Sequence, residues 1–235
     1  MTDCKTRRRV SERRIEHPAF AALYDRCMPD RFLIGRHREY LADGLSGRVL
    51  DVGAGNGAMI PYAADLGTDG LEYHAVEPDP HMRRRAVRTA ERSDLQVYLR
   101  GDRAESLPYV DDAFDTVLSG LVFCTIDDPD AALEEVARVV KPGGELRFLE
   151  HVRADGWRAR AQDRLNPLWE RAAGGCQLNR ETVERFVGHD AFDVLEIERI
   201  GFGVFPAAPI VRGRLRRRTD GASLGQRAAG FFETD

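Results

Sequence analysis

The sequence predicts an α/β fold in which a mostly parallel sheet carries helices on both faces. Short apolar runs alternate with amphipathic segments between residues 49 and 140, which is typical of parallel strands joined by crossover helices. The first run, residues 49–52, passes directly into glycines, and the next run ends at the acid Glu77. Ligands of such sheets bind beyond the carboxyl ends of the strands. These observations together predict a site for a nucleoside.

Two helices are expected ahead of this core. Apolar residues recur at helical spacing over residues 20–27, and a second helix is expected over residues 34–41. Leading helices of this kind commonly cover an open cleft. Tyr24 and His17 are therefore candidates for lining a substrate pocket, although Tyr24 could equally pack in the core and His17 could lie on the surface.

The core elements then alternate regularly. The helix expected over residues 129–140 carries Leu133, Val136 and Ala137 on one face and charged residues on the other. The other expected helices are residues 58–66, 81–92 and 182–187, and the expected strands are residues 49–52, 73–76, 95–99, 114–118, 145–149, 192–200 and a final run through 210–211.

The glycine turn Gly53-Ala54-Gly55 indicates that a ligand approaches the backbone closely. Glu77, at the end of a neighbouring strand, is placed to accept both hydroxyls of a ribose. Asp51 lies two residues before the first glycine, where a carboxylate favours a cationic amino group and disfavours a pyrophosphate. Because Gly53, Gly55 and Ala58 also fit the spacing of a dinucleotide fold, an NAD-dependent oxidoreductase stays open as an alternative.

Two further segments complete a set of four. Residues 101–108 follow the third run and place Asp102 where an adenine amino group needs an acceptor, and residues 141–144 join an amphipathic helix to a strand. In this order and spacing, the four blocks resemble the class I S-adenosylmethionine-dependent methyltransferases, particularly the small-molecule type called methyltransferase type 11, over residues 48–152. The resemblance implies a Rossmann-like fold with a seven-stranded, mostly parallel sheet whose last strand is antiparallel.

The resemblance also implies S-adenosylmethionine as methyl donor, S-adenosylhomocysteine as product and no metal. Glu77 would hold the ribose, Asp102 with the backbone at Arg103 or Ala104 would bind adenine, and Gly120 and Leu121 would lie near the sulfonium. The residues expected to bind the cofactor are Asp51, Gly53, Ala54, Gly55, Glu77, Pro78, Asp102, Arg103, Ala104, Ser119, Gly120 and Leu121.

Methyl transfer from a sulfonium depends mainly on positioning a nucleophile, so a general base is optional. His151, at the end of the fifth expected strand, is the first candidate, since imidazole titrates near neutrality. A structural histidine that caps the strand end is the other interpretation. Asp127 and Asp128 are further candidates, but an acidic pair before Pro129 is also a helix-start signal.

Residues 153–182 are expected to form a lid. Trp157, Leu165, Leu168 and Trp169 could form an apolar roof over a small substrate, or pack helices onto the sheet. This segment resembles the branch that includes animal thiol S-methyltransferases, which implies a thiol acceptor. N-methylation of a phospholipid headgroup, C-methylation of a quinone and a non-catalytic adenosyl-ligand binding module stay open. The residues expected in the acceptor pocket are Tyr24, Cys124, Trp157 and Trp169.

The length of 235 residues and the hydrophobic content of 43% are those of one α/β domain. A basic arm with cleft-covering helices is expected over residues 1–47, the methyltransferase domain over 48–218 and a mobile tail over 219–235. No apolar run reaches the roughly 18 to 20 residues that cross a bilayer, so the expectation is a cytoplasmic protein without a transmembrane segment.

The net charge of −4 argues against a nucleic-acid partner. Arginines cluster over residues 7–14 and 212–218, either as solvated charge or as a peripheral contact with an acidic membrane or a charged substrate. The four cysteines show no paired CxxC spacing. Free thiols are therefore expected, rather than disulfides or a zinc site.

Overall fold

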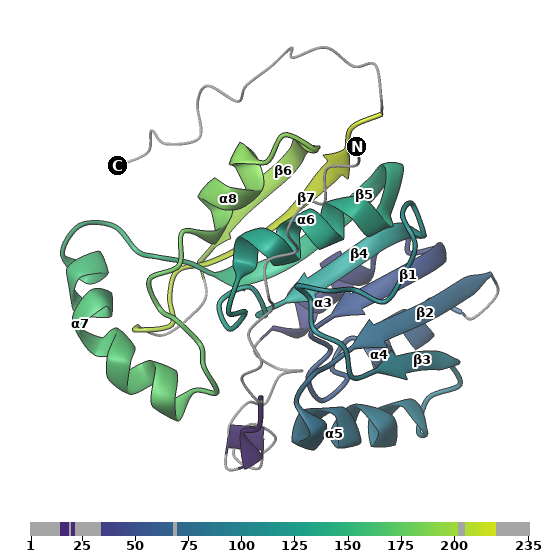
Figure 1. Cartoon of the computed structure of the whole chain (residues 1–235), viewed down its shortest axis with the longest axis horizontal. Coiled ribbons are helices and arrows are strands. Elements are labelled where there is room, and N and C mark those ends of the chain that lie inside the picture. Colours follow the sequence, from purple (N-terminus) through teal and green to yellow (C-terminus); the bar gives the residue numbers. More distant parts are fainter. Residues whose placement is uncertain (1–14, 19, 22–33, 68–69, 202–204, 220–235) are drawn as a thin grey trace, which may run out of the picture.

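The computed structural model describes residues 15–18, 20–21, 34–67, 70–201 and 205–219. The described strands are β1 (Gly47–Val52), β2 (Leu71–Val76), β3 (Val97–Arg100), β4 (Phe114–Gly120), β5 (Val140–His151), β6 (Phe192–Ile200) and β7 (Ile210–Arg217). Within the described residues they form one seven-stranded sheet in the order β3-β2-β1-β4-β5-β7-β6 (Figure 1). The pairs from β3 to β5 are parallel, and β7 runs antiparallel to both β5 and β6. The predicted fold class is confirmed.

The described helices cover both faces of the sheet. They are α3 (Gly35–Ala42), α4 (Ile60–Ala64), α5 (Pro80–Ala90), α6 (Pro129–Val139), α7 (Gly156–Ala172) and α8 (Thr182–Gly188). Figure 1 shows α6 and α8 in front of the sheet and α3 behind it. Side chains alternate along each strand, so β1 contributes Leu50 to the cluster under α6 and Val49 to the cluster under α3 and α4.

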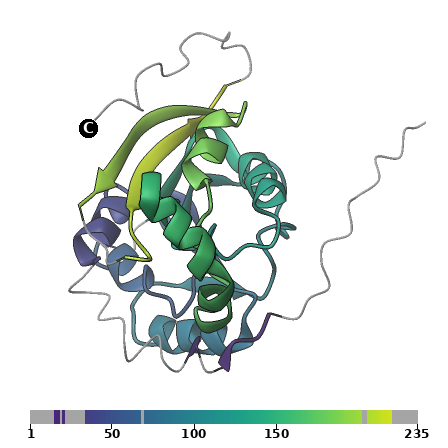
Figure 2. The same ribbon diagram turned by 90° about the vertical axis from the view of Figure 1, so that its left-hand side faces the viewer.

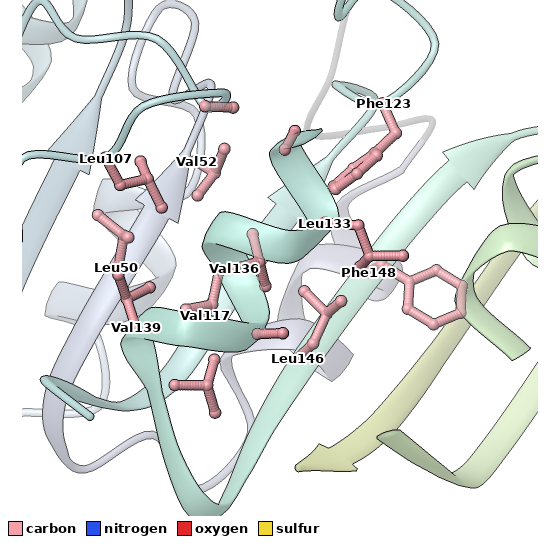
Figure 3. Close-up of a cluster of buried hydrophobic side chains, with 14 of the residues drawn as sticks. Leu50, Val52, Leu107, Val117, Phe123, Leu133, Val136, Val139, Leu146 and Phe148 are labelled. Atoms are coloured by element: carbon pink, nitrogen blue, oxygen red, sulfur yellow. The ribbon is translucent and has the colours of Figure 1, made fainter. Parts of the chain in front are cut away.

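The helix α6 shows how the sequence pattern becomes packing. Asp128 caps its first turn by accepting a hydrogen bond from the Ala131 amide at 3.1 Å, and Pro129 occupies the first turn. The apolar face, including Leu133 and Val136, lies against the strands (Figure 3). Burying one such side chain stabilises the fold by about 1.5–3 kcal/mol. Asp128 is therefore a helix cap rather than a base.

The order of strands reverses between β1 and β4, because the chain builds outward to β2 and β3 and then returns to the other side of β1. The helices that follow β1 and β4 lie on opposite faces of the sheet. This arrangement creates a crevice at the carboxyl ends of these two strands. The predicted site residues follow these strand ends.

Element boundaries differ from the predictions in a few places. Strand β5 begins at Val140, because Val140 pairs with Phe114 before the register shifts to Glu145 and Thr116. Residues 141–144 therefore bulge out of a continuous strand instead of separating a helix from a strand. Helix α4 is shorter than expected, and β3 starts two residues later.

The helix α7 stands apart from the sheet and crosses one end of the molecule (Figures 1 and 2). Trp157 and Leu168 are 67% and 71% exposed, and Leu165 is exposed as well. The buried anchor of this helix is the polar Gln162, which accepts from the Ala154 amide at 2.7 Å and donates to the Pro206 carbonyl at 2.9 Å. The expected apolar roof is wrong for three of its four residues, because polar contacts orient α7.

The arginines of β7 are paired with acids. Arg212 contacts Glu198 at 2.6 Å, and Arg214 contacts Glu196 at 3.4 Å. Such cross-strand pairs are partly solvated, which agrees with the interpretation of residues 212–218 as a solvated strand face. The arginines of residues 7–14 lie outside the described residues. Among the described helices, none combines the length and apolar character that crossing a membrane requires.

Candidate functional site

A cavity of about 710 Å³ opens at the carboxyl ends of the parallel strands. Its walls come from the glycine turn after β1, the ends of β2 and β5, the loop after β4 and the segment that follows α7. All but two of the residues expected to bind the cofactor line it, as do the candidate base His151 and two residues of the expected acceptor pocket. Those in the wall are Asp51, Gly53, Ala54, Gly55, Glu77, Pro78, Arg103, Ala104, Gly120, Leu121, Cys124, His151 and Trp169; Asp102, Ser119 and Trp157 are not in it.

The glycine turn requires its glycines for two reasons. Gly53 and Gly55 have φ of +65° and +59°, a region that costs other residues strain. A Cβ on Gly53 would also lie 2.5 Å from Cγ1 of Val122, whereas one on Gly55 would approach nothing closer than 3.5 Å. The turn after β1 is therefore packed tightly against the loop after β4, and its backbone is exposed to the cavity.

Glu77 is built into this turn. Its carboxylate accepts hydrogen bonds from the amides of Gly55 and Asp79, each at 2.8 Å. Burial raises the pKa of Glu77 to about 7, although these two hydrogen bonds oppose the rise. A carboxylate has acceptor sites beyond the two that the amides use, so Glu77 can also accept from ribose hydroxyls in the cavity.

Asp51 is buried beside Glu77, and the Tyr73 hydroxyl donates to it at 2.9 Å. Burial raises the pKa of Asp51 to about 6, against the hydrogen bond from Tyr73 and the charge of Arg38. The sequence did not identify Tyr73 or Arg38 as partners of Asp51. Tyr73 begins an apolar run, which indicates a position in the core. Two buried carboxylates with raised pKa values suit a ligand that brings a cation and hydroxyl donors.

The Asp102 prediction is corrected by the structure. The Asp102 carboxylate accepts from Nε of Arg100 at 2.9 Å, because the two side chains project from the same end of β3. Its neighbours Arg103 and Ala104 form the wall instead, together with the buried Glu105. Arg103 holds Glu105 at 2.9 Å and Asp127 at 2.6 Å. Asp127, which also lines the cavity, is thus an ion-pair partner of Arg103 in this structure.

Ser119 is buried behind the cavity wall and supports it. Its hydroxyl donates to Glu150 at 2.8 Å, and the same Glu150 oxygen accepts from the amides of Val122 and Phe123 at 3.0 and 3.1 Å. Leu121, in the loop thus held, adopts φ of +63°. A residue other than glycine is strained at a positive φ, and it keeps this conformation only where its surroundings enforce it. Glu150, which sequence reasoning did not single out, provides that enforcement.

At the other end of the cavity, three side chains converge from separate elements. Cys124 comes from the loop after β4, His151 from the end of β5, and Cys176 from the segment after α7. Nε2 of His151 lies 2.8 Å from Sγ of Cys176, and the Trp169 indole donates to the same sulfur at 3.4 Å. Both cysteines are free thiols.

These contacts shift the titration of the three groups. The hydrogen bond with Cys124, followed by those with His151 and Trp169, lowers the pKa of Cys176 to about 5 against the effect of burial. Burial alone would lower the pKa of His151, but the contact with Cys176 and the charge of Glu150 raise it. The Cys176 contact and burial raise the pKa of Cys124. These contacts therefore favour the thiolate form at Cys176 over that at Cys124.

The remaining predicted pocket residues divide in three ways. Trp169 lines the cavity, whereas Trp157 faces away from it and packs near Phe205 at a ring separation of 6.1 Å. His17 lies in the wall with its amide donating to Asp79 at 2.7 Å. Tyr24 lies outside the described residues.

The chain is similar in sequence to known methyltransferases. Residues 50–148 match the methyltransferase domain family. The chain is 34% identical to thiol S-methyltransferase TMT1B of Homo sapiens, over 66% of this chain and 65% of that protein. It is 32% identical to the Rattus norvegicus protein of the same name, over 71% and 69%. It is also 29% identical to phosphatidylethanolamine N-methyltransferase of Cereibacter sphaeroides, over 64% and 72%.

Solved structures share the fold at low sequence identity. The [4+2]-cyclase SpnF aligns with a TM-score of 0.64 and 21% identity, over 78% of this chain and 81% of that chain. A geranyl diphosphate C-methyltransferase from Streptomyces coelicolor, solved with S-adenosyl-L-homocysteine, aligns with a TM-score of 0.62 and 15% identity, over 78% and 76%. At these identities the likeness establishes the architecture alone.

Proposed function

The chain belongs to the class I S-adenosylmethionine-dependent methyltransferases, and from this premise we propose that it methylates the sulfur of a small thiol. The relatives named thiol S-methyltransferases support this acceptor. The observation that carries the proposal is the acceptor end itself, where a buried imidazole and a sulfur meet beside the indole of Trp169.

In this proposal one end of the cavity binds the cofactor, and the other end binds the acceptor. S-adenosylmethionine supplies an activated methyl group on a sulfonium. Asp51 and Glu77 are placed to hold its amino group and ribose, and the glycine turn offers backbone close to it. Positioning of the nucleophile in line with the methyl group supplies most of the catalysis. We propose that the strained backbone at Leu121 orients the nucleophile and the methyl group toward each other.

The acceptor must lose a proton, because the thiolate is the nucleophile. The pair formed by Nε2 of His151 and Sγ of Cys176, 2.8 Å apart in the cavity wall, is the group proposed to promote the loss of this proton. The apolar side chains of Val122, Ile126 and Trp169 enclose the same end. A small apolar thiol fits such surroundings, since apolar walls exclude water from the transfer.

The test is an acceptor screen with the purified protein and S-adenosylmethionine. Short alkanethiols, phosphatidylethanolamine vesicles and a quinol are incubated separately, and S-adenosylhomocysteine and the methylated product are quantified by mass spectrometry. We expect a methyl thioether in amounts equal to the S-adenosylhomocysteine formed. At limiting S-adenosylmethionine, Glu77→Ala should strongly reduce this product, and Trp157→Ala, which alters an exposed side chain, should not.

The second candidate is N-methylation of a phospholipid headgroup, which the similarity to phosphatidylethanolamine N-methyltransferase favours. Methylation of the vesicles with inert thiols would select this candidate. Methylation of the quinol alone would select C-methylation. Tight binding of S-adenosylhomocysteine without methylation of any acceptor class would indicate a binding module.

A further inference from the structure

The cluster of Cys124, His151 and Cys176 has a geometry that methyl transfer alone does not require. One potential ligand atom from each residue lies within 4.8 Å of the other two. All three residues line the cavity. Two thiols and an imidazole that converge from three separate elements form a donor set typical of zinc.

We propose that Cys124, His151 and Cys176 bind a Zn²⁺ ion whose fourth coordination position faces the acceptor end of the cavity. Three protein ligands with one open position are characteristic of zinc sites that take part in reactions, whereas purely structural sites use four protein ligands. A Cys₂His set is one of the established three-ligand combinations.

The distances require only small adjustments. Zinc binds sulfur at about 2.3 Å and imidazole nitrogen at about 2.0–2.1 Å, so a tetrahedral site separates a sulfur and a nitrogen ligand by roughly 3.5 Å. The contact of 2.8 Å between His151 and Cys176 would open by less than an ångström, and the other separations already fall within 4.8 Å. Side-chain rotations suffice for a change of this size.

The surroundings hold these ligands in place. The Gln177 amide donates to the Cys124 carbonyl at 2.9 Å, which joins the two cysteine-bearing segments. The Trp169 indole donates to Cys176 at 3.4 Å, and such outer contacts fix the orientation of metal ligands. Nδ1 of His151 is buried without a hydrogen-bond partner among the described residues, so Nε2 is the nitrogen that faces the two sulfurs.

The role of the ion rests on the proposed thiol acceptor. Binding of Zn²⁺ releases to solvent the protons that the cluster still holds, so that Cys124 and Cys176 coordinate as thiolates and His151 as the neutral imidazole. An acceptor thiol that takes the fourth position loses its own proton to solvent and binds as a thiolate. Its sulfur forms a bond to the methyl carbon, the bond from that carbon to the sulfonium breaks, and S-adenosylhomocysteine results. The neutral thioether is a weak ligand and leaves.

The binding test uses the full chain, purified in a phosphine reductant and freed of metal. Titration with Co²⁺, a spectroscopic substitute for Zn²⁺, should saturate at one ion per chain and produce a sulfur-to-cobalt charge-transfer band that Zn²⁺ then removes. Wild-type protein without this band, or with a disulfide between Cys124 and Cys176 under these conditions, would overturn the site.

Variants assign the ligands. Cys124→Ser, Cys176→Ser and His151→Gln should each weaken Co²⁺ binding roughly 100-fold or more, since outer contacts alone are worth about 10–100-fold. The double variant Cys4→Ser, Cys27→Ser removes the other two thiols of the chain and should bind Co²⁺ as the wild type does. Unchanged affinity for S-adenosylhomocysteine in each single variant shows that the fold is intact. Wild-type Co²⁺ binding by the single variants would contradict the assignment.

A last arm separates this inference from the proposed function. Ethanethiol added to the Co²⁺ protein together with S-adenosylhomocysteine should intensify the charge-transfer band as a third sulfur joins the ion. An unchanged band would show that the fourth position does not receive the acceptor. Methylation of thiols by metal-free protein at the full rate would overturn the inference and leave the proposed function standing, whereas Co²⁺ binding without thiol methylation would do the reverse.

Discussion

The cofactor end and the proposed acceptor end of the cavity are built on different principles. At the cofactor end, a glycine turn and the carboxylates Asp51 and Glu77 come from the ends of adjacent parallel strands. At the acceptor end, His151 and two cysteines come from a strand, a loop and the segment after a helix. One end relies on backbone geometry that the sheet dictates, and the other relies on side chains that only the assembled fold brings together. Substitutions should therefore separate cofactor binding from acceptor chemistry.

The largest effect is expected where the two ends touch, at Gly53. Gly53→Ala combines a left-handed φ, which costs other residues roughly 1–2 kcal/mol, with a clash against Val122, and overpacking typically costs about 1–3 kcal/mol. Gly55→Ala has a similar φ without the clash and serves as the matched control. Urea denaturation should show the larger loss for Gly53→Ala. Equal losses of stability in the two variants would mean that Val122 moves aside without destabilising the fold.

The next effect concerns the cofactor end alone. Glu77→Ala removes an acceptor that serves Gly55 and Asp79, and hydrogen bonds to charged groups are worth about 1.5–3 kcal/mol. Calorimetry should show S-adenosylhomocysteine affinity falling about 10–100-fold, with no gain in affinity for NAD. His151→Gln should leave that affinity within about threefold. A loss of similar size in both variants would refute the division between the two ends.

The pH dependence of the cofactor end follows from its buried acids. The folded-state pKa values of Asp51 and Glu77, about 6 and about 7, lie above their ordinary values. The folded protein therefore binds more protons than the unfolded chain between about pH 4 and 7, and this contribution to stability is complete below pH 4 and lost as the pH rises to 7. Asp51→Asn should flatten the lower part of this profile in denaturation experiments across that range.

Cofactor affinity should change in the opposite direction over the same range. The cationic amino group of the ligand favours ionised Asp51, so affinity should rise with pH by up to roughly tenfold per unit below pH 6. Calorimetry with S-adenosylhomocysteine at several pH values measures this slope. Affinity independent of pH in the wild type would show that Asp51 does not contact the amino group.

The smallest effect is expected from the two tryptophans of α7, which test the acceptor end. Trp169→Ala removes a cavity wall and the indole contact to Cys176, and should lower kcat/KM for the thiol about tenfold, since one lost hydrogen bond is worth about 1 kcal/mol and the packing adds to it. Trp157 is exposed, so Trp157→Ala should stay within twofold. Steady-state kinetics that rank these variants in the reverse order would contradict the cavity assignment.

The cofactor end was largely predictable from sequence, because contiguous motifs sit at strand ends and a parallel sheet aligns those ends. Asp102 departs from this rule, since its carboxylate accepts a hydrogen bond from Arg100, the last residue of β3. Trp157 and Leu168 failed because the helix α7 is anchored by Gln162 through polar contacts, which an apolar pattern does not reveal. The cluster of Cys124, His151 and Cys176 has no local spacing signal, because its members meet only after the loop, strand and helix have packed.

The position of β7 has a consequence for the order of assembly. This strand follows β6 in the chain but lies between β5 and β6 in the sheet, so β6 has no neighbour until β7 has been synthesised. Ile210, which begins β7, pairs with His151 and lines the cavity. The acceptor wall is thus completed only after β7 has been synthesised. An interrupted chain would retain the cofactor end without its acceptor wall, and an exposed edge of β5 would be left available for association with other chains.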